Sequence, residues 1–342
     1  MPGLKSPPVP VLMMHGVCDP VPEYASMPDG RTCLLGVEDF DRLLEWCRKD
    51  FDILRLGELN ELLASGNSAK YRPIILTFDD GLASTLDHAV PILKRHGLSA
   101  TMFVTTDWID SGVTPPIFEL ERVLSSEAPT RIELSVGEHS FRWNVENTAE
   151  IGGVLANLWT FLFERRIAPL EIQIDDLMVG GQPFRAAERP DRDFWFPATW
   201  GDLRDAVVAG TLEIGSHMKS HTPLTWIDRD GVEEEMARSK NRLENEFGLE
   251  VQACSYPHGM SNPLVCESAC KFYAWGFSNL GGLLRRGTPR HLAPRFHVPG
   301  ERWDAVKNRI RLARWDAFDV RSRLARSAAI FGAGSRTGVK PS

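Results

Sequence analysis

The sequence predicts an α/β protein: a distorted, incomplete (β/α) barrel of about seven strands, with a helical insertion over the active face. Three observations support this prediction. Short apolar strands alternate with amphipathic helical stretches along most of the chain. Closely spaced carboxylates and histidines directly follow two of these strands. One long stretch, residues 107–197, breaks the alternation, and we interpret it as an insertion.

The predicted strands share a short apolar core that ends in polar or turn-forming residues. They are Val9–Met14, Ile74–Phe78, Ala100–Thr105, Leu212–Ile214, Val251–Tyr256, Trp275–Ser278 and Phe296–Val298. Because helical stretches separate many of them, we expect the strands to pair in parallel.

The predicted helices are recognised by their amphipathic spacing and their ends. Examples are Val37–Lys49, Thr85–His96 and Asp230–Phe247, and glycine follows the last two at the C-cap. Thr199-Trp200-Gly201-Asp202 resembles a capping box that opens another helix.

The domain organisation follows from these patterns. Residues 1–300 are predicted to form the barrel domain, with residues 107–197 inserted in it as a helical cap. Within the cap, Asn147–Arg165 is a possible helix, and Gly180-Gly181-Gln182-Pro183 is loop-like. Residues 301–342 are predicted to form a basic C-terminal helix and tail.

Two adjacent carboxylates, Asp79 and Asp80, end the strand Ile74–Phe78. The chain turns at a strand end, so both side chains can face one pocket. A bound cation would offset their repulsion and keep both ionised. The alternative is an ordinary Asp-Asp-Gly turn, in which Gly81 accepts a positive φ.

A second cluster follows the strand Leu212–Ile214. His217 and His221 are four residues apart, a spacing that places both imidazoles on one face of a helical turn. Two surface histidines are the alternative. However, the carboxyl ends of parallel barrel strands open on one face, where active sites lie. One carboxylate and two histidines leave metal positions open for water and substrate, as a catalytic site requires.

The chain resembles the polysaccharide deacetylases, carbohydrate esterase family four. Thr77–Gly81 is similar to the family's first motif, Ser216–His221 to its second, and Ser255-Tyr256-Pro257-His258-Gly259 to its third. The opening Val9–Val17 resembles the first strand of the branch that deacetylates exopolysaccharides. The motifs stand in the family's order between about residue 9 and about residue 300.

The resemblance implies a role for each matching residue. Asp79 would be the general base, while Asp80, His217 and His221 would bind one divalent metal ion. Zinc is expected, and cobalt, nickel or manganese also suit this ligand set. The metal would activate a water molecule and polarise the acyl carbonyl. The backbone N–H of Tyr256 would stabilise the oxyanion.

Two further roles are less directly matched. The general acid of the exopolysaccharide branch corresponds to His15, and His297 is its rival. In the better-known third motif an arginine orients the catalytic aspartate, but Ser255 occupies that place here. Arg295 matches an arginine of the exopolysaccharide branch and is expected to supply the missing guanidinium from a late strand.

Substrate contacts are expected from aromatic residues and from the third motif. The aromatic residues of the insertion are Trp143, Trp159, Phe194, Trp195 and Phe196, most of which we expect to fill its small core. Trp195 and Trp200 lie close in sequence to the histidine-bearing strand, so these two are predicted to bind substrate. Pro257 and His258 are the other predicted substrate-binding residues.

Composition indicates a folded enzyme. The chain has 342 residues, of which 43% are hydrophobic, enough for a sizeable core. No stretch is apolar enough for a signal peptide or a membrane span, so we expect a cytoplasmic, possibly membrane-peripheral protein. Six cysteines, at positions 18, 33, 47, 254, 266 and 270, lack the dense spacing of a disulfide framework.

The C-terminal tail differs in charge from the rest of the chain. Residues 301–342 contain ten Lys/Arg and four acidic residues, a net charge of +6, whereas the whole chain carries −7. The stretch Trp303–Phe331 could lie on the inner face of an anionic membrane or cover the barrel as a solvated helix. No nucleic-acid partner is expected, and the oligomeric state is left open.

The function predicted from these residues is a metal-dependent hydrolase that removes an N-acetyl group from an amino sugar. The substrate would be a glycan, or its lipid-linked or nucleotide precursor. Alternatives are a catalytically inactive carbohydrate-binding relative, and a deformylase or amidase. A binding module has no need of Asp79 once the metal is held, which favours the enzyme.

Overall fold

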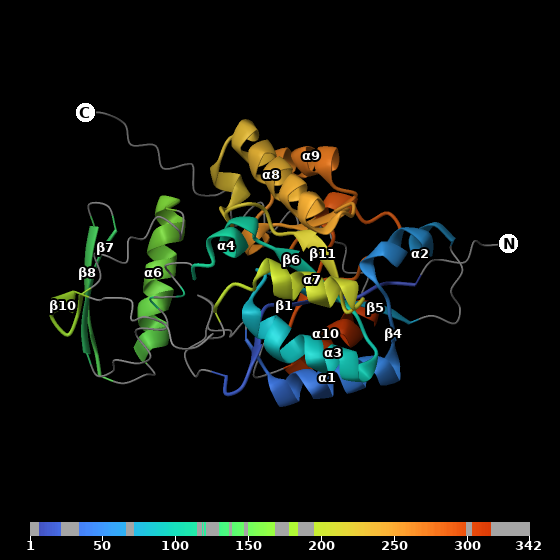
Figure 1. Cartoon of the computed structure of the whole chain (residues 1–342), viewed down its shortest axis with the longest axis horizontal. Coiled ribbons are helices and arrows are strands. Elements are labelled where there is room, and N and C mark those ends of the chain that lie inside the picture. Colours follow the sequence, from blue (N-terminus) through green and yellow to red (C-terminus); the bar gives the residue numbers. More distant parts are fainter. Residues whose placement is uncertain are drawn as a thin grey trace.

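The computed structural model describes most of the chain. The described residues are 7–21, 34–65, 72–114, 118, 120, 130–136, 139–146, 150–167, 178–183, 195–298 and 303–315. Figure 1 shows a curled parallel sheet flanked by helices, with a smaller sheet and one long helix, α6, to one side.

The main sheet contains all seven predicted strands. They pair in parallel in the order β13-β12-β11-β6-β5-β1-β14. Their bounds are β1 Val11–Met14, β5 Pro73–Phe78, β6 Ala100–Val104, β11 Leu212–Ser216, β12 Ala253–Ser255, β13 Trp275–Phe277 and β14 Phe296–His297. An eighth strand, β4 (Asp52–Ile53), pairs with the start of β5. The sheet is the distorted (β/α) barrel that the sequence predicts.

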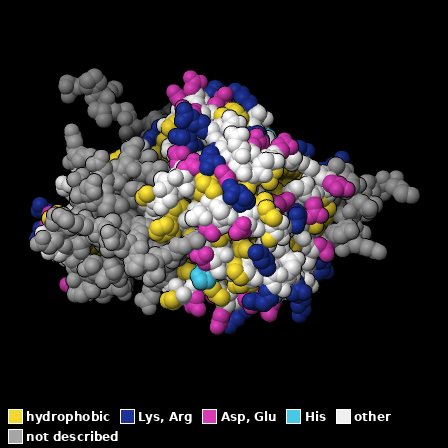
Figure 2. Space-filling view, in the orientation of Figure 1, with side chains coloured by type: hydrophobic (Ala, Val, Ile, Leu, Met, Phe, Trp, Pro, Cys, Tyr) yellow, Lys and Arg dark blue, Asp and Glu magenta, His cyan; other side chains and the backbone are white. Residues whose placement is uncertain are grey.

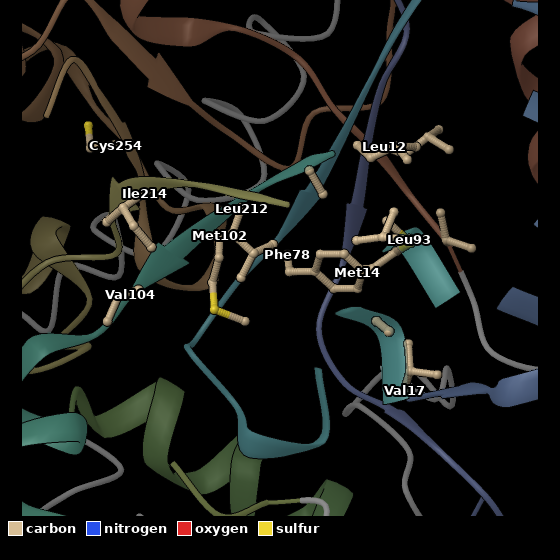
Figure 3. Close-up of a cluster of buried hydrophobic side chains, with 14 of the residues drawn as sticks. Leu12, Met14, Val17, Phe78, Leu93, Met102, Val104, Leu212, Ile214 and Cys254 are labelled. Atoms are coloured by element: carbon tan, nitrogen blue, oxygen red, sulfur yellow. The ribbon is translucent and has the colours of Figure 1, made fainter. Parts of the chain in front are cut away.

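The two faces of the strands supply two separate hydrophobic clusters. Leu12, Met14 and Phe78 belong to the large cluster between the sheet and its helices, part of which is drawn in Figure 3. Their sequence neighbours Val11 and Ile75 belong to a second cluster on the other face. Because side chains alternate along a strand, an apolar run buried on both faces fills both clusters.

The helices cover the sheet and begin and end where the sequence indicates. They are α1 Val37–Asp50, α2 Leu59–Ser65, α3 Val90–His96, α4 Thr106–Ser111, α7 Trp200–Val208, α8 Arg229–Phe247, α9 Pro263–Phe272 and α10 Trp303–Trp315. Gly97 and Gly248 cap α3 and α8 in the left-handed conformation, with φ of 66° at each. Thr199 and Asp202 form a capping box at α7.

The remaining short elements connect these parts. They are the parallel strands β2 Val17–Cys18 and β3 Leu35–Gly36, the π-helix η2 Thr85–Ala89, and the 3₁₀ turns η1 Leu56–Glu58, η6 Leu224–Trp226, η7 Pro257–Gly259 and η8 Arg290–Leu292. The third sequence motif runs from the last residue of β12, Ser255, through the turn η7.

The insertion is not the purely helical cap that the sequence suggested. Its described part contains the expected helix, α6 (Ile151–Arg165), together with an antiparallel sheet in the order β10-β9-β7-β8. The strands are β7 Thr130–Val136, β8 His139–Val145, β9 Met178–Val179 and β10 Gln182–Pro183. The glycine pair predicted as a loop, Gly180-Gly181, is the tight turn of the β9–β10 hairpin, at φ of 60° and 82°. Side chains of α6 and β7 fill a hydrophobic core of their own.

The start of the basic C-terminal region packs against the barrel. Val306 and Ile310 of α10 are buried in the large hydrophobic cluster, and Trp303 Nε1 donates a hydrogen bond to Asp39 of α1. This is the arrangement of a covering helix. Residues 316–342, the rest of the predicted tail, lie outside the described residues. None of the described helices is both long enough and apolar enough to cross a membrane.

The described surface carries both signs of charge. On the face drawn in Figure 2, Lys and Arg side chains are interspersed with Asp and Glu. Pairs such as Arg242 with Asp110 and Lys271 with Glu233 illustrate the mixing. In the described part of that face, no extended patch of one sign is visible.

Candidate active site

Asp79 and Asp80 lie at the carboxyl end of β5 and are both buried, with 2% and 4% of their surface exposed. Asp79 still follows the sheet, because its backbone N–H donates to Met14 of β1. The chain then bends sharply: Asp80 has φ of 77° and Gly81 of 86°. Two adjacent carboxylates are therefore buried at the same strand end, as the sequence predicted.

Asp80 faces both predicted histidine ligands. Its Oδ1 lies 3.4 Å from His217 Nε2 and 3.4 Å from His221 Nε2. One ligand atom from each of the three residues lies within 4.8 Å of the others. Asp80 Oδ1 is buried without a hydrogen-bond partner among the described residues. These distances are longer than usual hydrogen bonds. The arrangement of the three residues therefore suits joint coordination of a divalent cation better than direct hydrogen bonding among them.

The histidine loop is not the helical turn that the spacing suggested. Residues 217–221 form no helix, and Met218 and His221 both have φ of 66°. Glu235 of α8 holds this loop, because its carboxylate accepts the backbone N–H groups of Lys219 and Ser220 and the Ser220 hydroxyl. Sequence reasoning missed Glu235, whose position on a helix 14 residues beyond His221 carries no local signal.

The tautomer of His217 suits a metal ligand. His217 Nδ1 lies 2.9 Å from the backbone carbonyl of Ser255, which can only accept a hydrogen bond. Nδ1 therefore carries the proton, and in the neutral ring the lone pair of Nε2 points toward Asp80. Burial would raise the pKa of Asp80, but contacts with His217 and His221 outweigh it and hold the pKa well below its usual value.

Asp79 is clamped by Arg295. The two guanidinium nitrogens Nη1 and Nη2 donate to Asp79 Oδ1 and Oδ2, each at 2.7 Å, and both side chains are buried. Ser255 Oγ adds a third hydrogen bond, to Asp79 Oδ2 at 3.1 Å. Burial would raise the pKa of Asp79, but the charges of Arg295 and His217 reverse this and lower it.

Arg295 is held inside the barrel rather than on its surface. Its Nε donates to the Ser278 carbonyl, Nη1 to Thr77 Oγ1 and Nη2 to Ser255 Oγ. The guanidinium carbon lies 5.5 Å from the centre of the Phe103 ring. Arg295 thus lies where the sequence argument required a guanidinium, and the small Ser255 side chain contacts both members of the ion pair.

The two rival acids lie side by side. His15 follows β1 and His297 ends β14, and their ring centroids are 6.0 Å apart in an edge-to-face arrangement. His15 Nδ1 is buried without a hydrogen-bond partner among the described residues. Because β1 and β14 are paired, both imidazoles reach the same end of the barrel.

The Tyr256 backbone does not fit the role implied for it. Its N–H already donates to the Phe277 carbonyl, within the pairing of β12 and β13, so it is not available to an oxyanion. Its hydroxyl donates to the His291 carbonyl. A Cβ at Gly276 would lie 2.1 Å from that hydroxyl, so a glycine is required beside it. Tyr256 therefore has a structural position.

His258 of the third motif lies beside His221, one of the predicted metal ligands. Its ring lies 4.6 Å from that of His221, centroid to centroid, and its backbone has φ of 56°. Its Nε2 is buried without a hydrogen-bond partner among the described residues. The insertion covers this residue, because the rings of Trp159 and Phe163 of α6 lie 5.8 and 5.2 Å from it. Pro257, the other predicted substrate contact here, is buried.

The two predicted tryptophan contacts are both engaged by other side chains in this structure. Trp195 is 1% exposed and stacks on Phe118, at 4.2 Å between ring centroids. The Trp200 ring is covered by the guanidinium of Arg242, 4.0 Å from its centre, and its Nε1 donates to Asp110. Both predictions relied on nearness in sequence. In the structure, Asp110 of α4 and Arg242 of α8 hold the Trp200 ring, whereas Trp195 packs in a small separate cluster with Phe118 and Leu82. Trp108, not singled out from the sequence, lies 4.8 Å from the His221 ring.

Comparisons with known proteins identify the family of the chain. The family model described as polysaccharide deacetylase matches residues 66–152 and 182–273, just over half of the chain. A curated relative, the putative polysaccharide deacetylase YxkH of Bacillus subtilis, is 26% identical over 86 residues. That match covers 25% of this chain and 31% of the relative, so it spans less than a third of that protein.

Solved structures share the fold at low sequence identity. The deacetylase PplD of Streptococcus pyogenes superimposes with a TM-score of 0.57 at 16% identity, covering 86% of this chain and 93% of the other. IcaB of Ammonifex degensii gives 0.55 at 15% identity, with 89% and 97% covered. A de-N-acetylase of Aggregatibacter actinomycetemcomitans gives 0.55 at 13% identity, with 89% and 100% covered.

Proposed function

Because this chain belongs to the polysaccharide deacetylase family, we propose that it hydrolyses the N-acetyl group of an amino sugar with the help of one divalent metal ion. The proposal rests on one observation: a possible general base and a possible metal site are adjacent. A carboxylate clamped by Arg295 stands directly beside the three-residue set Asp80, His217 and His221. A module that only binds carbohydrate would not need the clamped Asp79.

Asp79 is the proposed general base. A carboxylate offers about four acceptor positions. Oδ2 accepts from Arg295 and Ser255, whereas Oδ1 accepts from Arg295 alone. One position on Oδ1 therefore remains for a water molecule. Arg295 lowers the pKa of Asp79, so the carboxylate stays ionised and able to take a proton at neutral pH.

Asp80, His217 and His221 are the proposed metal ligands. A metal ion held there would lower the pKa of a bound water molecule and would polarise the acyl carbonyl. Zinc is our first choice, and cobalt, nickel or manganese also accept two imidazoles and a carboxylate. Two hydrogen bonds orient these residues in the absence of metal. One joins the His217 ring to the Ser255 carbonyl, and the other joins the Glu235 carboxylate to the backbone of the histidine loop.

Two groups are proposed to assist breakdown of the tetrahedral intermediate. His15 is the proposed acid that protonates the departing amine, with His297 as the alternative. The backbone N–H of His258 is the proposed oxyanion donor. The N–H of Tyr256 is used within the sheet and Pro257 has none, so His258 supplies the next donor along the chain.

The substrate we propose is an N-acetylated amino-sugar glycan, or its lipid-linked or nucleotide-linked precursor. Acetate release measured separately from an oligosaccharide, a lipid-linked sugar and a nucleotide sugar would identify the class.

The test of the mechanism compares two adjacent substitutions. Asp79→Asn should retain the metal and lose activity by roughly a hundredfold or more, the usual value of general-base help. Asp80→Asn should lose metal and activity together. Metal content is measured by elemental analysis and activity by acetate release. Equal metal loss in both variants would show that the roles are wrongly assigned.

A further inference from the structure

A thiol and an imidazole lie in contact outside the proposed catalytic and metal-binding residues. Cys270 is on α9, beside α8 in Figure 1, and His291 is in the 3₁₀ turn η8. Cys270 Sγ lies 3.0 Å from His291 Nδ1. Neither residue contributes to the proposed catalytic chemistry.

The hydrogen bonds of His291 fix its tautomer. Its Nε2 lies 2.8 Å from the backbone carbonyl of Tyr273, which can only accept, so Nε2 carries the proton. In the neutral ring, Nδ1 then holds a lone pair and accepts the hydrogen of the Cys270 thiol. The backbone of His291 is also held, because its carbonyl accepts from the Tyr256 hydroxyl and the Cys266 thiol. The imidazole is therefore positioned in advance as a base for Cys270.

The other described cysteines are in environments that oppose ionisation. Burial raises the pKa of Cys18 to about 12 and that of Cys266 to about 11, and also raises those of Cys47 and Cys254. Of the five cysteines that the structure describes, Cys270 is the exposed one. Reactivity of a thiol requires both access and a way to form thiolate, and these meet at Cys270.

We propose that Cys270 is a modification site, a nucleophilic thiol activated by His291 that forms mixed disulfides with low-molecular-weight disulfides. The thiol proton moves to His291 Nδ1, and the thiolate attacks one sulfur of the disulfide. A new S–S bond forms as the old one breaks. The departing thiolate takes the proton back from the imidazolium, which restores the neutral base. This site is independent of the deacetylase reaction.

The experiment treats the reduced full-length chain at pH 7 with glutathione disulfide and maps the modified peptides by mass spectrometry over time. Cys270 should be modified first. Cys266→Ser, a matched control one helical turn away, should leave the Cys270 rate unchanged, whereas Cys270→Ser should remove the fast phase. Modification of Cys266 at the same rate as Cys270 would overturn the proposal.

The role of His291 is tested with His291→Asn, which can place an amide oxygen near the position of Nδ1 but supplies no base. We expect the rate constant for modification of Cys270 to fall by at least about threefold. The fall cannot exceed about thirtyfold, because an ordinary thiol is still roughly 3% ionised at pH 7 without a base. Local unfolding would expose the thiol further and raise the rate, so a fall is not explained by misfolding. An unchanged rate would exclude His291 as the base.

Discussion

Asp79 and Arg295 form the contact on which the site most depends. Both are buried, and their bidentate pairing is completed by Ser255 and Thr77. Without its partner, a buried carboxylate is an uncompensated charge in the low-dielectric protein interior. The guanidinium therefore serves both the orientation of Asp79 and the stability of the barrel interior.

The ion pair predicts a strong coupling between two substitutions. Arg295→Met should lower the free energy of unfolding by about 3–5 kcal/mol, because Asp79 is left buried and unpaired. In the double variant Asp79→Asn/Arg295→Met, the loss should be smaller than the sum of the single losses, with a coupling of about 1–3 kcal/mol. Urea unfolding of the four proteins measures this coupling. Additive losses would mean that the pair is not formed in solution.

The neighbouring imidazoles of His15 and His297 predict a test with two substrates. His15→Ala should reduce amide hydrolysis by about a hundredfold or more, because the leaving amine loses its proton donor. An activated aryl acetate, whose leaving group needs no proton, should be cleaved at nearly the parental rate. His297→Ala is the matched control across the 6.0 Å contact. The reverse pattern in the two variants would assign the acid to β14.

At the scale of elements, the site is assembled from the ends of strands and from loops that helices hold in place. β5 supplies both aspartates, β11 leads into the histidine loop, and β12 leads into His258. The loop after β11 is bent and non-helical, so its shape depends on α8. Glu235 makes that connection through three hydrogen bonds.

This connection predicts that Glu235→Ala weakens metal binding without removing a ligand. Loss of a residue that orients a ligand typically costs about 10- to 100-fold in affinity. Glu234→Ala is the matched control, since the neighbouring Glu234 pairs with Arg238 within the same helix. Zinc affinity measured by competition with a chromophoric chelator should fall for Glu235→Ala alone. Equal affinities would show that the loop keeps its shape without α8.

At the scale of the whole molecule, α6 of the insertion meets the barrel at the candidate active site. The His258 ring contacts two aromatic rings of α6, those of Trp159 and Phe163. The Phe163 ring in turn contacts Trp226 of the barrel. The insertion thus adds an aromatic boundary to a site that the barrel strands alone would leave more open. Such a boundary suits a substrate longer than one sugar.

The insertion predicts a dependence on substrate length. Trp159→Ala should raise the KM for an N-acetylated amino-sugar oligomer several-fold and leave hydrolysis of a small aryl acetate unchanged. Trp143→Ala is the control within the same insertion, because Trp143 stacks on Phe141 in the small sheet. Equal effects of Trp159→Ala on both substrates would indicate disturbance of His258 rather than loss of a glycan contact.

The sequence alone determined the strands and the main helices, and it predicted the residues of the candidate site. Each strand is an apolar run that contributes to one or both of two hydrophobic clusters, and the glycines after α3 and α8 mark those helix ends, so local pattern was sufficient. Asp79, Asp80, His217 and His221 were found because they follow strand ends, which meet on one face of a parallel barrel.

The tertiary structure decided the contacts that no local pattern encodes. Arg295 reaches Asp79 across 216 positions of sequence, and Glu235 reaches the histidine loop from another element. Phe118 stacks on Trp195 and Arg242 covers one side of Trp200, contacts that nearness in sequence did not indicate. Tyr256 was misjudged because β13 takes its N–H. Spacing along the chain indicates which chemical groups a site can contain. Which hydrogen-bond donors and aromatic rings remain free for a ligand depends on which elements pack together.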